Sequence, residues 1–212
     1  MQDESGVRKI LNDGVFYDFL QNILGAGKAR VWLAENYWNV KKGDSIIDIG
    51  CGTGEVLDYL DFDIQYTGFD VSKKYIDVAR KKYGNRGKFS IGTAEEFLRN
   101  PNTLPEADLV LCNGLLHHLE DKEVMQVLEL SKELLAEKGR LVCVEPVFLK
   151  KQTKASKWLM SKDRGQNVRS FDEWNKIVGK IFNTFSLDVT TGLIRAPYVH
   201  VIITCNNVPD TA

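Results

Sequence analysis

The feature that most constrains the fold is the stretch Ser45–Glu55, which reads SIIDIGCGTGE. Three isoleucines surround one aspartate, and three alternating glycines follow. A short β-branched apolar run that stops at glycines is typical of a buried parallel strand entering a tight turn. The composition of Glu55–Leu60 favours a helix, so the stretch predicts a strand–turn–helix unit. Glycines at such a turn let a ligand lie close to the backbone, and the helix start favours a ligand with anionic or carboxylate groups.

The spacing of the glycines indicates which ligand the turn binds. A dinucleotide turn reads G-x-G-x-x-G, whereas Gly50, Gly52 and Gly54 give G-x-G-x-G, with Asp48 two residues before the first glycine. This pattern resembles the first motif of class I S-adenosylmethionine (SAM)-dependent methyltransferases. The resemblance implies that SAM is the cofactor. It also implies that Asp48, Gly50, Cys51 and Gly52 line its amino-acid part and its ribose.

The composition of the chain sets broad limits on its function. Its 212 residues show no break in composition, which predicts a single domain over 1–212 with a helical cap over 1–40. A net charge of −1 gives no reason to expect nucleic acid as a partner. The polar beginning, the absence of an apolar run of about 20 residues and four cysteines without disulfide or metal spacing predict a cytoplasmic protein without a membrane span.

The next predicted strands carry candidate contacts to the adenosine part of SAM. Gln65–Asp70 reads as a strand ending on an acid about 20 residues after the first glycine, the offset that brings a carboxylate to a ribose. The alternative is that Asp70 only caps the following helix. The resemblance implies that Val71 lies against the adenine and that Thr93 and Ala94 contact its edge. Thr93 stands where the family often has an acid.

Ala107–Cys112 reads as the fourth strand, and the turn after it reads NGLLHHL. This L-H-H-L turn also resembles the family, and it implies that Asn113 lies beside the methionine chain. His117 and His118 are the nearest candidates for a general base, because an imidazole titrates near neutral pH. The alternative is that the histidines only order the turn, since SAM carries an already activated methyl group and alignment can suffice. We find no Asp/Asn cluster that suggests a metal.

The remaining chain completes the predicted sheet. A helix over Asp121–Leu135 leads to a fifth strand, Arg140–Glu145, and a further helix covers Phe171–Phe182. The last two strands are joined by only six residues and must therefore pair antiparallel. The resemblance implies an α/β, Rossmann-like, seven-stranded sheet of order 3-2-1-4-5-7-6, with strand 7 antiparallel and helices on both faces.

A basic segment lies between the fifth strand and the last helix. Residues 150–169 contain seven Lys and Arg against one acid, Asp163, and the insertion as a whole spans 146–170. It is either a cationic lid over an anionic substrate or an ordinary solvated loop. Our candidates for substrate binding are Glu145 at the end of the fifth strand, Arg164 and Arg169 in the segment, and Tyr198 and His200 at the start of the last strand.

As a whole, residues 40–205 resemble bacterial small-molecule methyltransferases with the L-H-H-L turn and an R-x-P-Y-x-H ending. The resemblance implies methyl transfer to a small molecule, either an anionic metabolite or a surface-glycan or lipopolysaccharide precursor, with S-adenosylhomocysteine (SAH) as product. The alternatives are an RNA methyltransferase, which the basic segment favours and the net charge disfavours, and a protein that binds SAM without catalysis. The sequence leaves the oligomeric state open.

Overall fold

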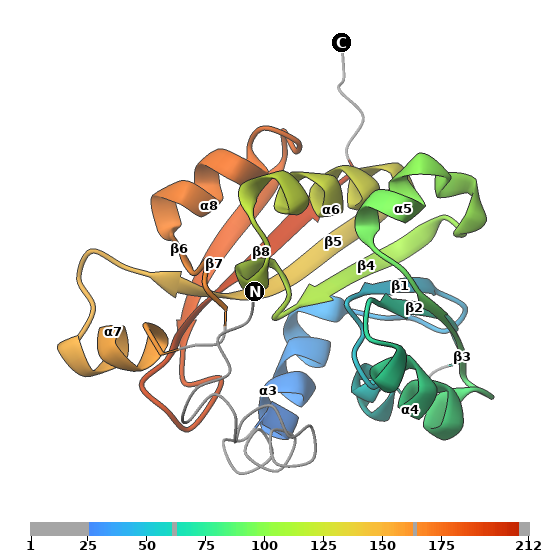
Figure 1. Ribbon diagram of the computed structural model, residues 1–212, viewed down its shortest axis with the longest axis horizontal. Helices are drawn as coiled ribbons and strands as arrows, with labels where there is room; N and C mark the ends of the chain where they lie inside the picture. Colours follow the sequence, from blue (N-terminus) through green and yellow to red (C-terminus); the bar gives the residue numbers. More distant parts are fainter. Residues whose placement is uncertain (1–25, 61–62, 163–164, 208–212) are drawn as a thin grey trace.

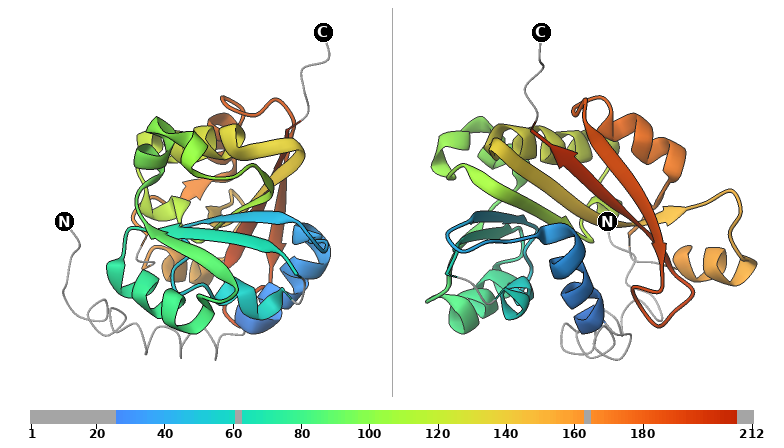
Figure 2. Two further views of the ribbon diagram at one scale, coloured as in Figure 1. Left: turned by 90° about the vertical axis from the view of Figure 1, so that its right-hand side faces the viewer. Right: turned by 180° about the vertical axis from the view of Figure 1, so that it is seen from behind.

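The structure, a computed structural model, describes residues 26–60, 63–162 and 165–207. One twisted sheet lies between two layers of helices (Figures 1 and 2), and the α/β class is confirmed. Residues 1–25 of the helical cap expected over 1–40 lie outside the described residues. The α-helices are α3 (Ala26–Leu33), α4 (Lys73–Tyr83), α5 (Ala94–Arg99), α6 (Asp121–Leu134), α7 (Lys154–Met160) and α8 (Phe171–Val178).

The strands follow the predicted order. They are β1 (Ser45–Ile49), β2 (Gln65–Asp70), β3 (Gly87–Ile91), β4 (Ala107–Asn113), β5 (Leu135–Phe148), β6 (Arg169–Ser170), β7 (Phe185–Thr191) and β8 (Val199–Asn206). Their order is β3-β2-β1-β4-β5-β8-β7, and β8 runs antiparallel to both its neighbours. The two-residue β6, which pairs with the end of β5, is an addition to the seven strands expected.

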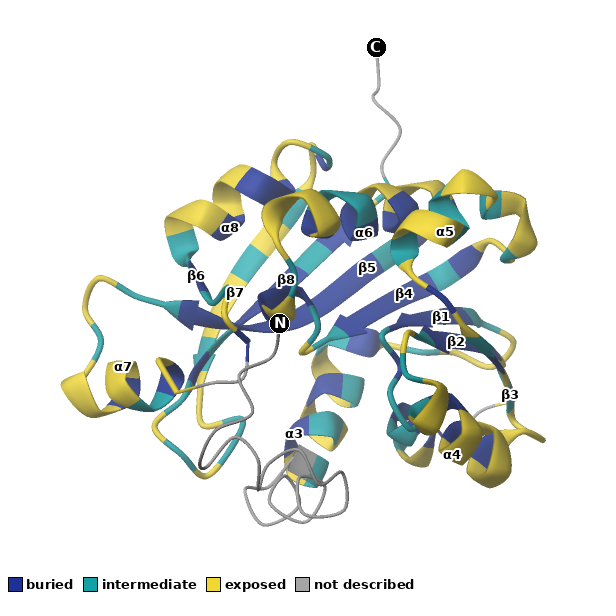
Figure 3. Ribbon diagram, in the orientation of Figure 1, coloured by how far each residue is buried: buried dark blue, intermediate teal, exposed yellow. Residues whose placement is uncertain are grey.

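The central strands of the sheet are buried on both faces because they alternate apolar side chains between two cores. Ile47 and Ile49 of β1 belong to the core under α6 and α8, whereas Ile46 faces the core that contains α4. Figure 3 shows the buried strands in the middle of the molecule, with the exposed residues on the outer sides of the helices. This explains why β1 and β4 read as nearly continuous apolar runs.

Three elements differ from the sequence expectation. The helix expected at Glu55–Leu60 is a five-residue 3₁₀ helix, η2 (Glu55–Tyr59), so it has little of the dipole of a longer α-helix. In the expected helical cap, α3 continues into a π-helix, η1 (Ala34–Trp38), which ends at the left-handed Asn39. Strand β5 begins earlier than expected, at Leu135, and bulges against β4 before regular pairing starts at Arg140.

The order of the strands determines where a ligand can bind. The chain moves outward from β1 to β2 and β3, and then returns to the other side of β1 with β4. The connections at the carboxyl ends of β1 and β4 therefore leave in opposite directions, which opens a crevice at that edge of the sheet. Within the described ranges, no helix combines the length and the apolar character needed to cross a bilayer.

Candidate functional site

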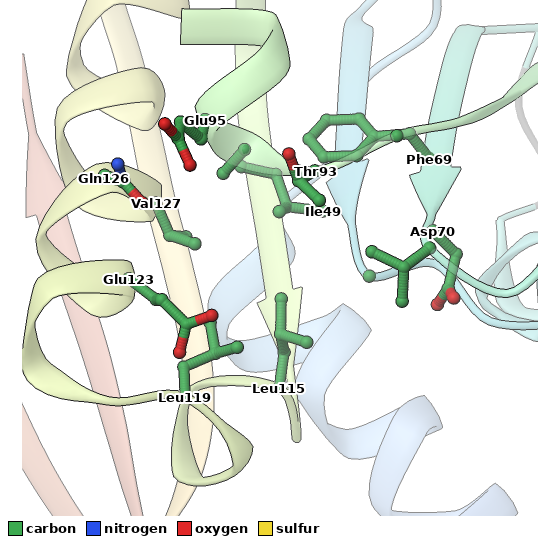
Figure 4. A pocket seen from close by; sticks show the side chains of 14 residues that line it. Ile49, Phe69, Asp70, Thr93, Glu95, Leu115, Leu119, Glu123, Gln126 and Val127 are labelled. Carbon is green, nitrogen blue, oxygen red and sulfur yellow. The ribbon is translucent and has the colours of Figure 1, made fainter. Parts of the chain in front are cut away.

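A cleft of about 170 Å³ lies at this edge of the sheet. Figure 4 shows Asp70 on one side and Glu123 and Gln126 of α6 on the other, with Leu115 and Leu119 nearby. The cleft thus combines an apolar floor with a few polar groups, as small-molecule sites usually do. The residues that line it are Ile49, Gly50, Phe69, Asp70, Val71, Gly92, Thr93, Ala94, Glu95, Leu115, Leu119, Glu123, Gln126 and Val127.

The glycine turn after β1 has the conformation that its sequence predicts. Gly50, Gly52 and Gly54 all have positive φ, at 72°, 54° and 78°, a region that other residues adopt at a cost of about 1–2 kcal/mol. The backbone N–H groups of Gly50 and Cys51 both donate to the carbonyl of Phe69, at 2.8 and 3.0 Å. A Cβ on Gly52 would have no described atom within 4 Å, so the turn leaves open space on that side.

Asp70 connects the end of β2 to the glycine turn. Its Oδ2 accepts from the Gly52 N–H (3.1 Å), and its Oδ1 accepts from the Ser72 N–H (2.7 Å). The N-cap of α4 is Ser72, whose Oγ accepts from Tyr75 N–H. Each carboxylate oxygen of Asp70 has a further lone pair. The next residue, Val71, lines the cleft and is 68% exposed.

Four residues expected to contact SAM are not among those that line this cleft: Asp48, Cys51, Gly52 and Asn113. Asp48 is buried, and its Oδ2 accepts a hydrogen bond from the Tyr66 hydroxyl (2.7 Å). Burial raises the pKa of Asp48 to about 7, although the Tyr66 hydroxyl and Arg30 act in the opposite direction. Burial also raises the pKa of the Cys51 thiol.

The turn after β3 also forms part of the cleft. The Thr93 hydroxyl in this turn already accepts a hydrogen bond within the protein. Thr93 Oγ1 accepts from Glu96 N–H (3.2 Å), and Glu96 Oε2 accepts from Thr93 N–H (2.8 Å), which forms the capping box of α5. Ala94 is the first residue of α5. The hydroxyl retains one lone pair for a ligand.

Sequence reasoning missed the wall that α6 contributes. Glu123, Gln126 and Val127 line the cleft and share one face of the helix, at positions i, i+3 and i+4. The sequence shows this spacing but does not show which face of α6 lies over the cleft. Glu123 also closes a capping box, because its Oε2 accepts from Glu120 N–H (2.9 Å).

The loop between β4 and α6, residues 114–120, contains both histidines. His118 is exposed, whereas His117 is buried, and their ring centroids lie 4.1 Å apart. Asn113, the last residue of β4, has a buried Oδ1 that meets no hydrogen-bond partner among the described residues. Such an orphaned acceptor is costly unless a ligand or water completes it.

Glu145 lies on β5 and is fully buried. Its Oε1 accepts from the N–H groups of Leu115 (2.9 Å) and Leu116 (2.8 Å). Its Oε2 accepts from the backbone N–H of His117 (3.1 Å) and lies 2.7 Å from that residue's Nδ1. Both oxygens of this expected substrate contact are therefore engaged with the loop.

Arg169 is also buried, and it donates hydrogen bonds to carbonyls of the same loop. Its guanidinium donates to Leu116 O (3.0 Å), Leu119 O (2.9 Å) and Asn167 O (3.2 Å), and twice to Asp121 Oδ1 (3.0 and 2.7 Å). These bonds account for all five of its N–H donors. Arg164, the other arginine expected to bind substrate, lies outside the described residues.

Tyr198 and His200 lie side by side, with ring centroids 5.1 Å apart. His200 is opposite Pro146 of β5 in the sheet register, and neither ring is among the residues that line the cleft. In the basic segment, Lys150 forms an exposed ion pair with Asp172 (2.9 Å), and Trp158 of α7 is 65% exposed. Within the described ranges, no three His, Cys, Asp or Glu residues are grouped as a metal site.

The comparisons with known proteins agree with this architecture. A family model described as a methyltransferase domain matches residues 47–141. An uncharacterized methyltransferase of Schizosaccharomyces pombe, C1347.09, is 30% identical over 115 residues, which is 50% of this chain and 39% of that protein. The regions that align cover only 17–42% of the length of the curated relatives that match.

Two solved structures show the same fold at low sequence identity. The mitomycin 7-O-methyltransferase MmcR matches with a TM-score of 0.68 and 16% identity, over 96% of this chain and 61% of that chain. Phosphoethanolamine N-methyltransferase 2 of Haemonchus contortus, solved with phosphomonomethylethanolamine and SAH, matches with a TM-score of 0.70 and 14% identity, over 97% and 61%. Residues 47–141 of this chain therefore match a methyltransferase-domain model, and the chain shares the fold of these solved methyltransferases.

Proposed function

We propose that this chain transfers a methyl group from SAM to a small-molecule acceptor. The observation that carries the proposal is the open glycine turn at Gly52, bonded to the carboxylate of Asp70 at the switch point of the sheet. A side-chain-free turn beside an acid at this edge fits a nucleoside whose ribose needs an acceptor. SAM supplies a methyl group on a positively charged sulfur, which is already activated for displacement.

The residues around the cleft fit the parts of SAM. In this proposal Asp70 accepts from the ribose hydroxyls, and Val71, Thr93 and Ala94 surround the adenine. Gly50, Cys51 and Gly52 allow the close approach of the amino-acid part, and Asp48 is the buried acid two residues before this turn. The unpartnered Oδ1 of Asn113 is an acceptor for the amino group of the methionine moiety, which would satisfy an otherwise orphaned buried atom.

The contribution of the protein to the rate is mainly alignment. Holding an acceptor in line with the methyl group can supply about 7–11 kcal/mol, more than a general base usually adds. A base is needed only if the acceptor must lose a proton. We assign that role to His118, because it is exposed at the lip of β4, whereas His117 is buried against Glu145.

The acceptor in this proposal is small and bears an anionic group. Five lysines and no acid occur between residues 149 and 162, and this segment follows the strand that ends next to the loop of the histidines. Lysine ammonium groups attract phosphate or carboxylate. A metabolite or a surface-glycan precursor has such groups.

Two measurements test the proposal. Calorimetry should show that SAM and SAH bind to the wild-type chain and that NAD does not. Methyl-labelled SAM, incubated with the protein and the small-molecule fraction of a cell extract, should then label a product that anion exchange retains. If SAM binds and no fraction is labelled, the protein binds SAM without catalysis. If labelled RNA is the only product, the acceptor class is wrong.

A further inference from the structure

Two buried charged side chains hold the β4–α6 loop, residues 114–120, from opposite directions. We propose that Glu145 and Arg169 are positioning residues, which set the width of the SAM cleft by fixing this loop and do not contact the substrate. The inference rests on the proposed function, because it concerns the same cleft. It replaces the direct substrate contacts that the sequence suggested for both residues.

Glu145 holds the loop by accepting hydrogen bonds from the backbone N–H groups of the loop. Its two oxygens accept three consecutive backbone N–H groups, those of Leu115, Leu116 and His117, at 2.8–3.1 Å. The fourth partner is Nδ1 of the His117 ring. A carboxylate offers about four lone-pair sites, so Glu145 has no site left for a substrate. A carboxylate that accepts these bonds makes Nδ1 of His117 the protonated nitrogen.

Arg169 holds the same loop by donating hydrogen bonds to the backbone carbonyls of the loop. Three of its five donated bonds go to backbone carbonyls, two of them in the loop, at Leu116 and Leu119. Its guanidinium also lies over the ring of Trp174, 5.1 Å from the ring centroid. Because every donor has a partner and the side chain is buried, an anionic substrate finds no free donor on Arg169.

The position of this loop affects the cleft, because two of its side chains line the cleft. Leu115 and Leu119 line the cleft, and a Cβ on Gly50 would lie only 2.9 Å from Leu115 Cδ2. A shift of the loop therefore moves two side chains that line the SAM site and changes the contact with the glycine turn. Binding sites lose affinity when their supporting residues leave the walls about 1 Å out of place.

The end of the basic segment is attached to the same loop. Asn167 N–H donates to His117 O (3.0 Å), and a Cβ on Gly165 would collide with the His117 ring. Arg169 follows two residues later. The two positioning residues therefore also fix where this segment meets the loop, next to His118.

The first experiment measures the affinity for SAH of the full chain by calorimetry. Glu145→Gln should weaken SAH binding at least tenfold at a temperature where circular dichroism shows the variant to be folded. The control is Val178→Ala, a buried α8 position outside the cleft, which lowers the melting temperature but should change the affinity less than twofold. Equal affinities for Glu145→Gln and wild type would overturn the proposal.

The second measurement is specific for the hydrogen bond to the imidazole. The chain has only three histidines, so ¹⁵N NMR can assign the tautomer of His117. In the wild type, Nδ1 should carry the proton. In Glu145→Gln the amide oxygen can still accept from the loop, but the amide nitrogen donates, so His117 should change to the Nε2–H tautomer. Protonated Nδ1 in both proteins would contradict the assignment.

If Glu145→Gln does not fold, substitutions of Arg169 test the same proposal. Arg169→Lys retains the charge but cannot reach three carbonyls at once. We expect it to weaken SAH binding as much as Arg169→Met does, at least tenfold. Wild-type affinity in Arg169→Lys would overturn the proposal. Failure of the wild-type chain to bind SAH would instead overturn the proposed function.

Discussion

The glycine turn after β1 and the loop after β4 lie at the same edge of the sheet, on paired strands, but they are held in different ways. The turn depends on its own backbone and on residues of the next strand, with Phe69 O and Asp70 as its partners. The loop depends in addition on side chains 28–53 residues away, because Glu145 accepts from three of its N–H groups and Arg169 donates to two of its carbonyls.

This difference shows that two walls of one cleft can respond differently to substitution. Changes in the glycine turn act directly, through the space and the hydrogen bonds that a ligand uses. Changes behind the β4–α6 loop act from a distance, through residues that a ligand does not touch. The following predictions test this contrast, beginning with the largest expected effect.

Arg169→Met should cost the most stability. It removes every bond of a buried guanidinium, including those to the carbonyls of Leu116 and Leu119, so we expect the free energy of unfolding to fall by about 3–5 kcal/mol. Urea unfolding measures it. The matched control is Lys150→Met, which removes an exposed ion pair and should cost at most about 1 kcal/mol. Similar losses in the two variants would show that the loop does not depend on Arg169.

Asp48→Asn should change how stability depends on pH. The folded-state pKa of Asp48, about 7, lies above its ordinary value of 3.8 because of burial. Folding therefore favours the neutral carboxyl, whose contribution is complete below about pH 4 and is lost as the pH rises through about 7. The variant should gain stability over the wild type by on the order of 2–4 kcal/mol between pH 4 and pH 8. Parallel urea-derived curves over that range would contradict the pKa assignment.

Asp70→Ala should weaken binding more than it weakens the fold. The substitution removes the carboxylate that bonds to Gly52 N–H and that we assign to the ribose, so the affinity for SAH should fall at least about tenfold, or 1.4 kcal/mol. Asp77→Ala, which removes only an exposed ion pair with Lys73, is the control. Calorimetry that gives the same affinity for both variants would remove the ribose assignment.

The last prediction compares Gly50→Ala with Gly52→Ala and concerns the difference between the two variants in stability and in affinity for SAH. Both positions have positive φ, so each substitution should cost about 1–2 kcal/mol of stability. Gly50→Ala should cost more, because its Cβ would meet Leu115 of the neighbouring loop, whereas a Cβ on Gly52 would enter open space. Gly52→Ala should instead show the larger loss of SAH affinity. Thermal unfolding and calorimetry measure the two effects, and the reverse ranking would contradict this arrangement.

The sequence predicted most of the sheet, because each strand carries its own signal. The β-branched run before Gly50 predicted the first strand, and the six-residue connection before the last strand predicted the antiparallel ending. The order of the strands came from the resemblance to a known family. The bulge of β5 was not predictable, because it depends on close contact with β4: a Cβ on Gly139 would lie 2.5 Å from Ala107 O. Local composition carries no record of such a contact.

The candidate site divides in the same way. Asp70 and the glycines could be named because their spacing along one β-α-β unit fixes where they meet. The α6 wall and the hydrogen bonds of Glu145 and Arg169 could not be predicted. A carboxylate at the end of the fifth strand can bind a substrate or accept hydrogen bonds from the backbone, and the sequence does not distinguish the two.

The sequence therefore predicted the class of the fold, and it placed the glycine turn next to the acid of the neighbouring strand, because these two lie within one β-α-β unit. Only the tertiary structure decided which charged groups face the cleft and which support it. The physical reason is that a buried charge must find hydrogen-bond partners wherever packing places them. For Glu145 and Arg169 those partners are the backbone of a loop that lies about 30 and 50 residues earlier in the chain.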